Sequence, residues 1–243
     1  MSGAFVWGLV AGSSLMVGGL VALRFRIPQT VLGLIMAFGA GVLISAVAYE
    51  LVGEAFDTSA GSGGVALGLF AGAGAFFGGD FLIDRLGGHG RKSSGGEQEA
   101  GSALAITLGI VLDGIPESIV IGLGLLEGGG VSVAVITAVF LSNLPEAIAA
   151  TTGLAKSGWT SRRILSLWSA VAVVCALSSF VGYTAFDAAS PRTVAFVLAF
   201  AGGAILTMLA ETMMPEAYKH GGKYVGVVTT IGFALAFALT VLE

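Results

Sequence analysis

Residues 103–126 read "ALAITLGIVLDGIPESIVIGLGLL", an apolar stretch interrupted by Asp113, Pro116 and Glu117. Its length suits a helix that crosses a hydrocarbon core of about 30 Å, which takes roughly 20 residues. Only 11% of the chain is charged, and a carboxylate within a membrane is costly. The stretch therefore predicts a transmembrane helix in which the acids have a functional role.

The composition of the whole chain extends this prediction. Of the 243 residues, 56% are hydrophobic and 39 are glycine, and the mean hydropathy is positive. This composition is typical of an integral membrane protein and excludes an ordinary soluble domain. The first apolar run has no basic residues before it and leads directly into a second run, so we expect a retained helix and not a signal peptide. Apolar runs of spanning length lie near 4–23, 31–53, 64–83, 103–126, 131–155, 164–186, 193–214 and 222–242.

We therefore expect an all-α integral membrane protein with eight transmembrane helices in one domain, residues 1–243. Positive charge predicts its orientation. Ten of the 11 lysines and arginines fall in the odd-numbered connections between these runs, and Arg192 is the exception. The positive-inside rule then places the odd connections in the cytoplasm and both termini outside. The longest connection, about 86–102, is rich in Gly, Ser and charge and predicts a mobile cytoplasmic linker.

Two internal repeats refine the expected fold. The segment "AFGAGVLISAVAYELVGEAF" (37–56) matches "AFAGGAILTMLAETMMPEAY" (199–218) at several positions, including Phe38/Phe200 and Gly41/Gly203. The segments lie on spans two and seven, which cross in opposite directions. An inverted-topology repeat follows, with helices 1–3 related to helices 6–8 around a central pair of helices 4 and 5.

The second repeat joins that central pair. "DGIPES" (113–118) on span four matches "SNLPEA" (142–147) on span five. Both motifs lie near the midplane, and residues four apart share a helical face. We therefore expect the two helices to present one set of side chains to a common point and to bind a cation there. The set is Asp113, Glu117, Ser142, Asn143 and Glu146.

The prolines suggest how backbone oxygens could join this site. Pro116 and Pro145 should kink their helices and free the carbonyls of Leu112 and Leu141. The alternative is that both prolines are simple packing kinks. The carboxylates also have an alternative, as protonated groups that hold helices together. Since no lysine or arginine lies inside any span, we expect a mobile cation as their partner.

Other polar residues carry weaker expectations. Four acids toward the ends of spans two and seven could form vestibules or simply reach water: Glu50, Glu54, Glu211 and Glu216. His89 and His220 lie in cytoplasmic connections and are expected to be solvated. Cys175 is the only cysteine, and we expect a buried packing residue.

At these motifs the chain resembles the ZIP family of divalent metal transporters, whose span four carries His-Asn-x-Pro-Glu-Gly and span five His-x-x-Pro-Glu. The long loop after span three and the "ETMMPEA" end of span seven (211–217) also look like that family. The resemblance implies that Glu117 and Glu146 bind metal, that Asp113 and Ser142 stand at the two histidine positions, and that Asn143 assists. It also implies that Glu211 lines an exit path.

The departures from the family pattern bear on the choice of metal. Both histidines are absent, Gly114 replaces the asparagine of span four, and span six has no acid, so we expect one metal site and not two. An all-oxygen ligand set suits hard cations such as Mn²⁺ or Mg²⁺. The family resemblance favours zinc or iron, and the choice stays open.

The resemblance and the motifs together predict a carrier that moves a divalent cation of the Zn, Fe or Mn class toward the cytoplasm by alternating access. A metal-selective channel and a non-transporting metal sensor are the alternatives. An intramembrane enzyme is the least favoured class, since no HExxH motif is present. We expect no cofactor, with the cation as substrate and lipid as surroundings, and no nucleic acid. A bacterial inner (plasma) membrane is the expected location, and a homodimer is left open.

Overall fold

The structure is a computed structural model that describes residues 2–59, 63–88, 91, 93–94, 103–127 and 133–242. All regular secondary structure in these ranges is helical. The α-helices are α1 (Ser2–Arg24), α2 (Gln29–Ala46), α3 (Glu54–Thr58), α4 (Gly64–Ile83), α5 (Ala103–Gly124), α6 (Val133–Lys156), α7 (Ser161–Phe186), α8 (Pro191–Met208), α9 (Met214–Gly221) and α10 (Val225–Leu242). The described ranges also contain the π-helices η1 (Val47–Gly53), η2 (Asp84–Gly88) and η5 (Leu209–Met213) and the 3₁₀ turns η4 (Leu125–Glu127) and η6 (Gly222–Tyr224).

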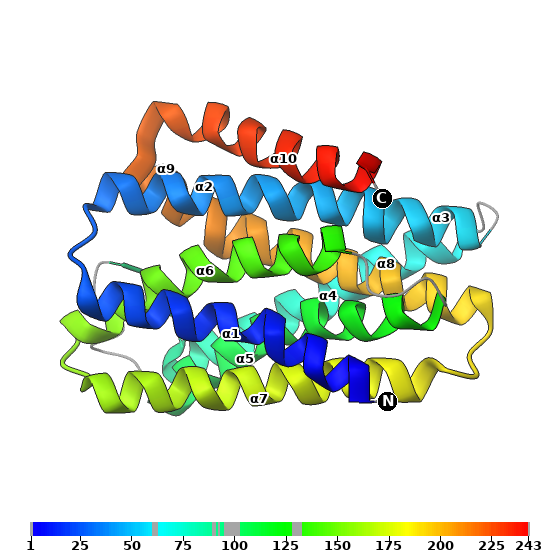
Figure 1. The fold of residues 1–243 in the computed structure, drawn as a ribbon, viewed down its shortest axis with the longest axis horizontal. Coiled ribbons are helices and arrows are strands. Elements are labelled where there is room, and N and C mark those ends of the chain that lie inside the picture. Colours follow the sequence, from blue (N-terminus) through cyan, green and yellow to red (C-terminus); the bar gives the residue numbers. More distant parts are fainter. Residues whose placement is uncertain are drawn as a thin grey trace.

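The membrane character expected from the sequence is supported by the lengths of these helices. Within the described residues, seven helical stretches are long and apolar enough to cross a bilayer. The last of them, Pro191–Leu242, has 52 residues and contains Gly222 at a φ of 59°. That backbone conformation is open to glycine and strained for most other residues. The chain folds back there, and α10 lies along α2 (Figure 1).

The connections divide between two ends of the bundle. Both ends of the described chain lie at one end, and the turns after α1, α6 and α9 lie at the other (Figure 1). We call this second end the basic end, defined by the turns 25–28, 157–160 and 222–224. Seven of the 11 lysines and arginines lie in these turns or within three residues of them. The charge segregation seen in the sequence is therefore also a segregation in space.

Glycines let α2 and α10 pack with their backbones in contact. A Cβ atom added at Gly41 would overlap the carbonyl oxygen of Thr229, and one added at Gly232 would overlap the carbonyl oxygen of Phe38. Small residues of this kind are the usual means by which membrane helices approach closely. Neither glycine can be replaced by a larger residue without moving the helices apart.

The pair α4 and α8 uses the same device. A Cβ atom at Gly203 would overlap the carbonyl oxygen of Leu69, and one at Gly72 would overlap the carbonyl oxygen of Phe200. Gly203 and Phe200 are the residues that align with Gly41 and Phe38 in the repeated sequence. The α4/α8 contact is thus built on the same aligned positions as the α2/α10 contact.

The π-helical segments also fall at matching places. In the alignment of 37–56 with 199–218, Val47 lies over Leu209. These are the first residues of η1 and η5. A π turn inserts an extra residue into a helix and is frequent at functional sites.

Candidate functional site

A small buried cavity lies among α1, α5, α6 and α7. Its volume is about 20 Å³, which is enough for one water molecule or a bare ion. The cavity is lined by Leu15, Ile110, Asp113, Gly114, Asn143, Glu146, Ala150 and Trp168. Three of the five residues expected at the cation site therefore meet around one space, which we call the Asp113 cavity.

The polar residues of the Asp113 cavity are almost completely buried. Asp113 is 3% exposed, Asn143 4% and Glu146 6%. Trp168 forms part of the wall, and its indole N–H donates to the hydroxyl oxygen of Thr151 at 2.8 Å. Carboxylate and amide oxygens are ligands that hard cations prefer, and charges attract more strongly in a buried space than in bulk water.

The glycine at position 114 is explained by the packing of α5 on α7. A Cβ atom there would lie 3.2 Å from the Cys175 sulfur. Any larger side chain in its place would press on the Cys175 side chain. The cysteine itself is buried at 3% exposure, as the sequence predicted.

Of the five residues expected at one point, Glu117 and Ser142 do not line the Asp113 cavity. Glu117 is 2% exposed and lines a second cavity of about 20 Å³, where Glu50 is the other acid and the remaining lining is apolar. Ser142 is fully buried, and its hydroxyl donates to the carbonyl oxygen of Val139 at 3.0 Å. A residue four positions further along α5 turns by about 40° around the helix axis, which is sufficient to face a different space.

Both prolines lie inside continuous helices, Pro116 in α5 and Pro145 in α6. The Pro145 ring packs against α2, where a Cβ atom added at Gly39 would come within 2.9 Å of its Cγ. This packing suits the alternative in which the proline fits two helices together. It is equally compatible with a freed carbonyl at Leu141.

Asp113 has a partner that the sequence did not suggest. The Nε and Nη2 atoms of Arg91 donate to Oδ2 and Oδ1 of Asp113 at 3.0 and 2.9 Å. Such a two-pronged pair between guanidinium and carboxylate is among the strongest polar contacts in proteins. The expectation that no cationic side chain reaches the intramembrane acids is therefore wrong. Arg91 comes from the connection after α4, so the absence of arginine within the spans did not exclude it.

Two further acids hold the same guanidinium. Nη2 of Arg91 also contacts Oδ1 of Asp80 near the end of α4, and Nη1 lies 3.9 Å from Oδ1 of Asp84. Burial opposes the charge on Arg91, but Asp113 and Asp80 outweigh that effect and raise its pKa above the ordinary value. Sequence reasoning missed Asp80, although its position four residues before Asp84, at the end of an apolar run, was a usable signal.

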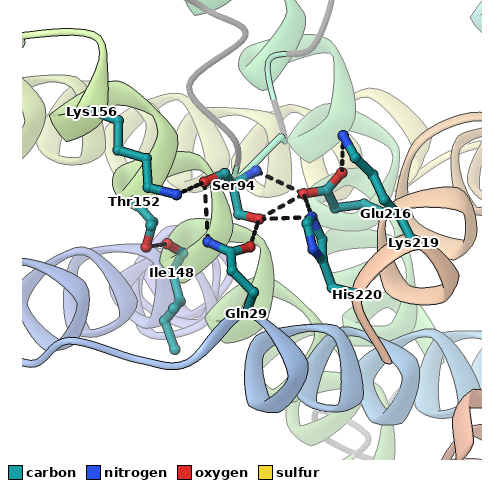
Figure 2. Close-up of polar contacts among 8 residues, drawn as sticks. All are labelled: Gln29, Ser94, Ile148, Thr152, Lys156, Glu216, Lys219 and His220. Atoms are coloured by element: carbon teal, nitrogen blue, oxygen red, sulfur yellow. Dashed lines mark hydrogen bonds and ion pairs between the residues drawn. The ribbon is translucent and has the colours of Figure 1, made fainter. Parts of the chain in front are cut away.

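A second cluster lies close by, around Ser94 (Figure 2). The backbone N–H and the hydroxyl of Ser94 donate to Oε1 of Glu216 at 2.7 and 2.8 Å, and the hydroxyl lies 3.2 Å from Nε2 of His220. Gln29 and Lys156 bind the same serine, with Lys156 Nζ donating to its carbonyl oxygen at 2.8 Å. Ser94 thereby joins the start of α2, the end of α6 and α9.

These contacts correct three expectations. Within the connection 86–102, Arg91, Ser93 and Ser94 are buried and bound, so this part is not a solvated linker. His220 is not solvated either, because its ring contacts Glu216 at 3.1 Å and its side chain is 16% exposed. Glu216 is 8% exposed and bound to Ser94, so it does not reach water as an interfacial residue. His89 and the rest of the connection lie outside the described residues.

The other vestibule candidates are more open. Glu50 and Glu54 are half-buried on η1 and at the start of α3, and Glu211 is exposed on η5. Glu211 lies near enough to Asp80 and Arg91 to interact with their charges. Glu211 is thus associated with the Arg91 cluster, whereas Glu50 faces the same cavity as Glu117.

Among the residues that the structure describes, no three His, Cys, Asp or Glu side chains are arranged to bind a metal ion together. No protein-family model matches the chain, and no curated protein matches it in sequence.

Proposed function

We propose that the chain is a carrier of divalent cations, with the Asp113 cavity as the place where the ion rests. The observation that carries this proposal is the meeting of Asp113, Asn143 and Glu146 around a buried cavity inside a bundle of apolar helices. Intramembrane acids that face a bundle interior mark ion pathways more often than they stabilise the fold. The cation replaces the positive charge that Arg91 supplies in this structure.

The direction of transport in this proposal is toward the cytoplasm, and the basic end is the cytoplasmic end. The charge asymmetry of the connections supports this assignment. The position of both chain ends at the opposite end of the bundle supports an even number of crossings (Figure 1). Eight crossings result when the 52-residue stretch is divided at Gly222.

The inverted repeat supports alternating access as the mechanism. The α2/α10 and α4/α8 contacts use aligned glycines, and η1 and η5 begin at aligned residues. In carriers with inverted repeats, two halves of related structure exchange conformations around a site at the midplane. Here the site lies on the central helices α5 and α6.

The ligand set favours hard cations. Every polar atom that lines the Asp113 cavity from a side chain is an oxygen, apart from the Asn143 amide nitrogen and the indole nitrogen of Trp168. Oxygen ligands suit Mn²⁺ or Mg²⁺, and the resemblance to the ZIP family keeps Zn²⁺ and Fe²⁺ among the candidates. A channel and a metal sensor remain the alternatives.

Uptake into proteoliposomes tests the function. The purified chain should take up at least one of Mn²⁺, Zn²⁺, Fe²⁺ or Mg²⁺ with a rate that saturates as the concentration rises. A rate that rises without saturation indicates a channel, and binding without uptake indicates a sensor. Absence of both binding and uptake for all four ions rejects the proposal.

A topology reporter tests the assignment of the two ends. Fused after Glu243, the reporter should be found outside the cytoplasm. A cytoplasmic position contradicts the even number of crossings and the inverted repeat.

A further inference from the structure

Arg91 and Ser94 fasten one short segment across the basic end of the molecule. We call Arg91, Ser93 and Ser94 the strap. Its first residue binds Asp113, which lines the Asp113 cavity. Its last residue is bound to α2, α6 and α9 (Figure 2). All three residues are at most 5% exposed. The strap thereby connects the central helices to helices of both proposed halves.

The guanidinium of Arg91 has two sets of partners. Asp113 lies on α5 and lines the cavity, while Asp80 and Asp84 lie at the end of α4 and outside the cavity lining. A positive charge that loses Asp113 therefore still has two carboxylates beside it. This arrangement allows Arg91 to give up Asp113 without becoming an unpaired buried charge, which would be costly.

We propose that Arg91 is a tethered cation that occupies Asp113 when no transported ion is bound, and that the strap closes the Asp113 cavity from the basic end in this state. The proposal rests on the proposed function. An entering divalent cation takes Asp113, the guanidinium is left to Asp80 and Asp84, and the strap loosens. The cation and Arg91 of the strap thus exclude each other at the Asp113 carboxylate. Binding of the cation is thereby coupled to opening of the Asp113 cavity at the basic end.

The strength of this competition can be estimated. A site whose binding-competent form is only a fraction of the population binds its ligand more weakly by that fraction. If Arg91 holds Asp113 about nine-tenths of the time, its removal should tighten cation binding about tenfold. The same removal should open the cavity to reagents at the basic end.

Direct binding of Mn²⁺ to the purified protein tests the competition. Arg91→Gln should bind Mn²⁺ about tenfold more tightly than the unmodified chain. Arg91→Lys keeps the charge without the two-pronged geometry and should show a smaller change in the same direction. Arg85→Gln is the matched control, because Arg85 is exposed and packs over the Phe81 ring. The affinity of this variant for Mn²⁺ should equal that of the unmodified chain.

Ser94→Ala tests the other end of the strap. It removes the hydroxyl contacts with Gln29, Glu216 and His220 while leaving the backbone contacts. Binding of Mn²⁺ should tighten by about two- to threefold, since only part of the anchor is lost. Ser169→Ala is the control, because that exposed hydroxyl donates within its own helix to the carbonyl oxygen of Leu165, 2.9 Å away.

A cysteine reporter measures closure without any metal. Ala150→Cys, in a Cys175→Ser background, places one thiol on the wall of the Asp113 cavity. Arg91→Gln and Arg91→Lys should each speed its reaction with a water-soluble maleimide, and Mn²⁺ should speed the reaction in the background protein. Arg85→Gln should leave the rate unchanged.

The outcomes separate the two proposals. Unchanged or weaker Mn²⁺ binding in both Arg91 variants, with an unchanged maleimide rate, overturns the strap proposal and leaves transport standing. A lowered melting temperature with unchanged affinity also overturns it, since Arg91 is then a structural ion pair. The Arg91 variants could instead react faster with maleimide than the background protein, while no divalent cation is bound or taken up by the chain. That result supports closure by the strap and rejects the proposed function. If Arg91→Gln does not fold, Arg91→Lys decides alone.

Discussion

Asp113 on α5 and Ser142 on α6 occupy matching positions, each four residues before a glutamate and each almost completely buried. Their side chains are satisfied in opposite ways. Ser142 donates to a carbonyl of its own helix, three residues earlier, whereas Asp113 binds a guanidinium 22 residues away. A hydroxyl can be satisfied locally within a helix, but a buried charge needs a counter-charge from elsewhere. Equal positions in a repeated motif therefore do not imply equal roles.

The largest expected effects concern the two glutamates that follow the prolines. Glu117→Gln and Glu146→Gln keep the shape of the side chain and remove its charge, so each should reduce cation uptake by more than about 100-fold, since even indirect partners of a metal cost 10–100-fold. Asp187→Asn, an exposed change at the end of α7, should have no effect. The melting temperature without metal should stay the same or rise, because buried carboxylates are costly and repel each other.

These glutamate variants can also break the comparison between the two helices. Normal uptake with a lowered melting temperature in both would show that the acids are structural. A large loss for Glu146→Gln beside a small loss for Glu117→Gln would place Glu117, which lines a separate cavity, outside the ion path.

The next effect separates Asp113 from Ser142 directly. Asp113→Asn leaves Arg91 buried with a weaker partner and should lower the free energy of unfolding by about 3 kcal/mol, the low end for breaking a buried pair, because Asp80 and Asp84 remain. Ser142→Ala should cost less than about 1 kcal/mol. Chemical denaturation in detergent without divalent cations measures both. Equal losses would mean that the Arg91–Asp113 pair adds nothing to stability.

The lengths of the apolar runs allowed the helices to be predicted from the sequence, because a bilayer demands a narrow range of helix length. The expected run at 64–83 coincides with α4, and the others end within a few residues of a helix end. The π-helical ends of η1 and η5 could not be predicted, because they depend on how neighbouring helices pack.

The site was only partly predictable, for a related reason. The matching depth of the two motifs anticipates that Asp113, Asn143 and Glu146 line one cavity, but the spacing of four residues did not decide which side chains share it, since Glu117 and Ser142 do not line it. Arg91 and Ser94 lie in a stretch whose composition is that of a linker, and their contacts are with residues 22 and 122 positions away. Local sequence does not indicate such distant partners, so the composition predicts a mobile linker for both residues.

Adding a histidine to the site should change the preference between metals by a smaller factor than the loss of uptake expected for the glutamate variants. Asp113→His places an imidazole on the cavity wall and should shift uptake toward Zn²⁺ over Mn²⁺ by about tenfold, because nitrogen ligands favour zinc. Ser142→His should shift this preference less, since the Ser142 hydroxyl donates to a carbonyl oxygen of its own helix. Competition between the two metals in proteoliposomes measures the shift. An unchanged preference between Zn²⁺ and Mn²⁺ for Asp113→His would mean that this position does not contact the ion.

The smallest expected effects are those of the prolines. Pro116→Ala and Pro145→Ala each restore a backbone N–H that can pair with Leu112 or Leu141, so the free energy of unfolding should change by less than about 1 kcal/mol. If the freed carbonyls help to hold the cation, affinity for Mn²⁺ should fall several-fold in both variants. Unchanged affinity in both would assign the prolines to packing alone, as the Pro145 contact with Gly39 already suggests for α6.

The backbone contact between α2 and α10 has a consequence for how the chain is made. Gly41 and Gly232 belong to facing helices, yet they are separated by about 190 residues, which a ribosome takes on the order of 10–40 s to synthesise at 5–20 residues per second. During that interval the glycine face of α2 has no α10 to cover it. Assembly of this half of the bundle therefore has to be completed after translation has almost ended. Changes at Gly41 or Gly232 should accordingly reduce the yield of assembled protein more than they alter any property of the molecules that do assemble.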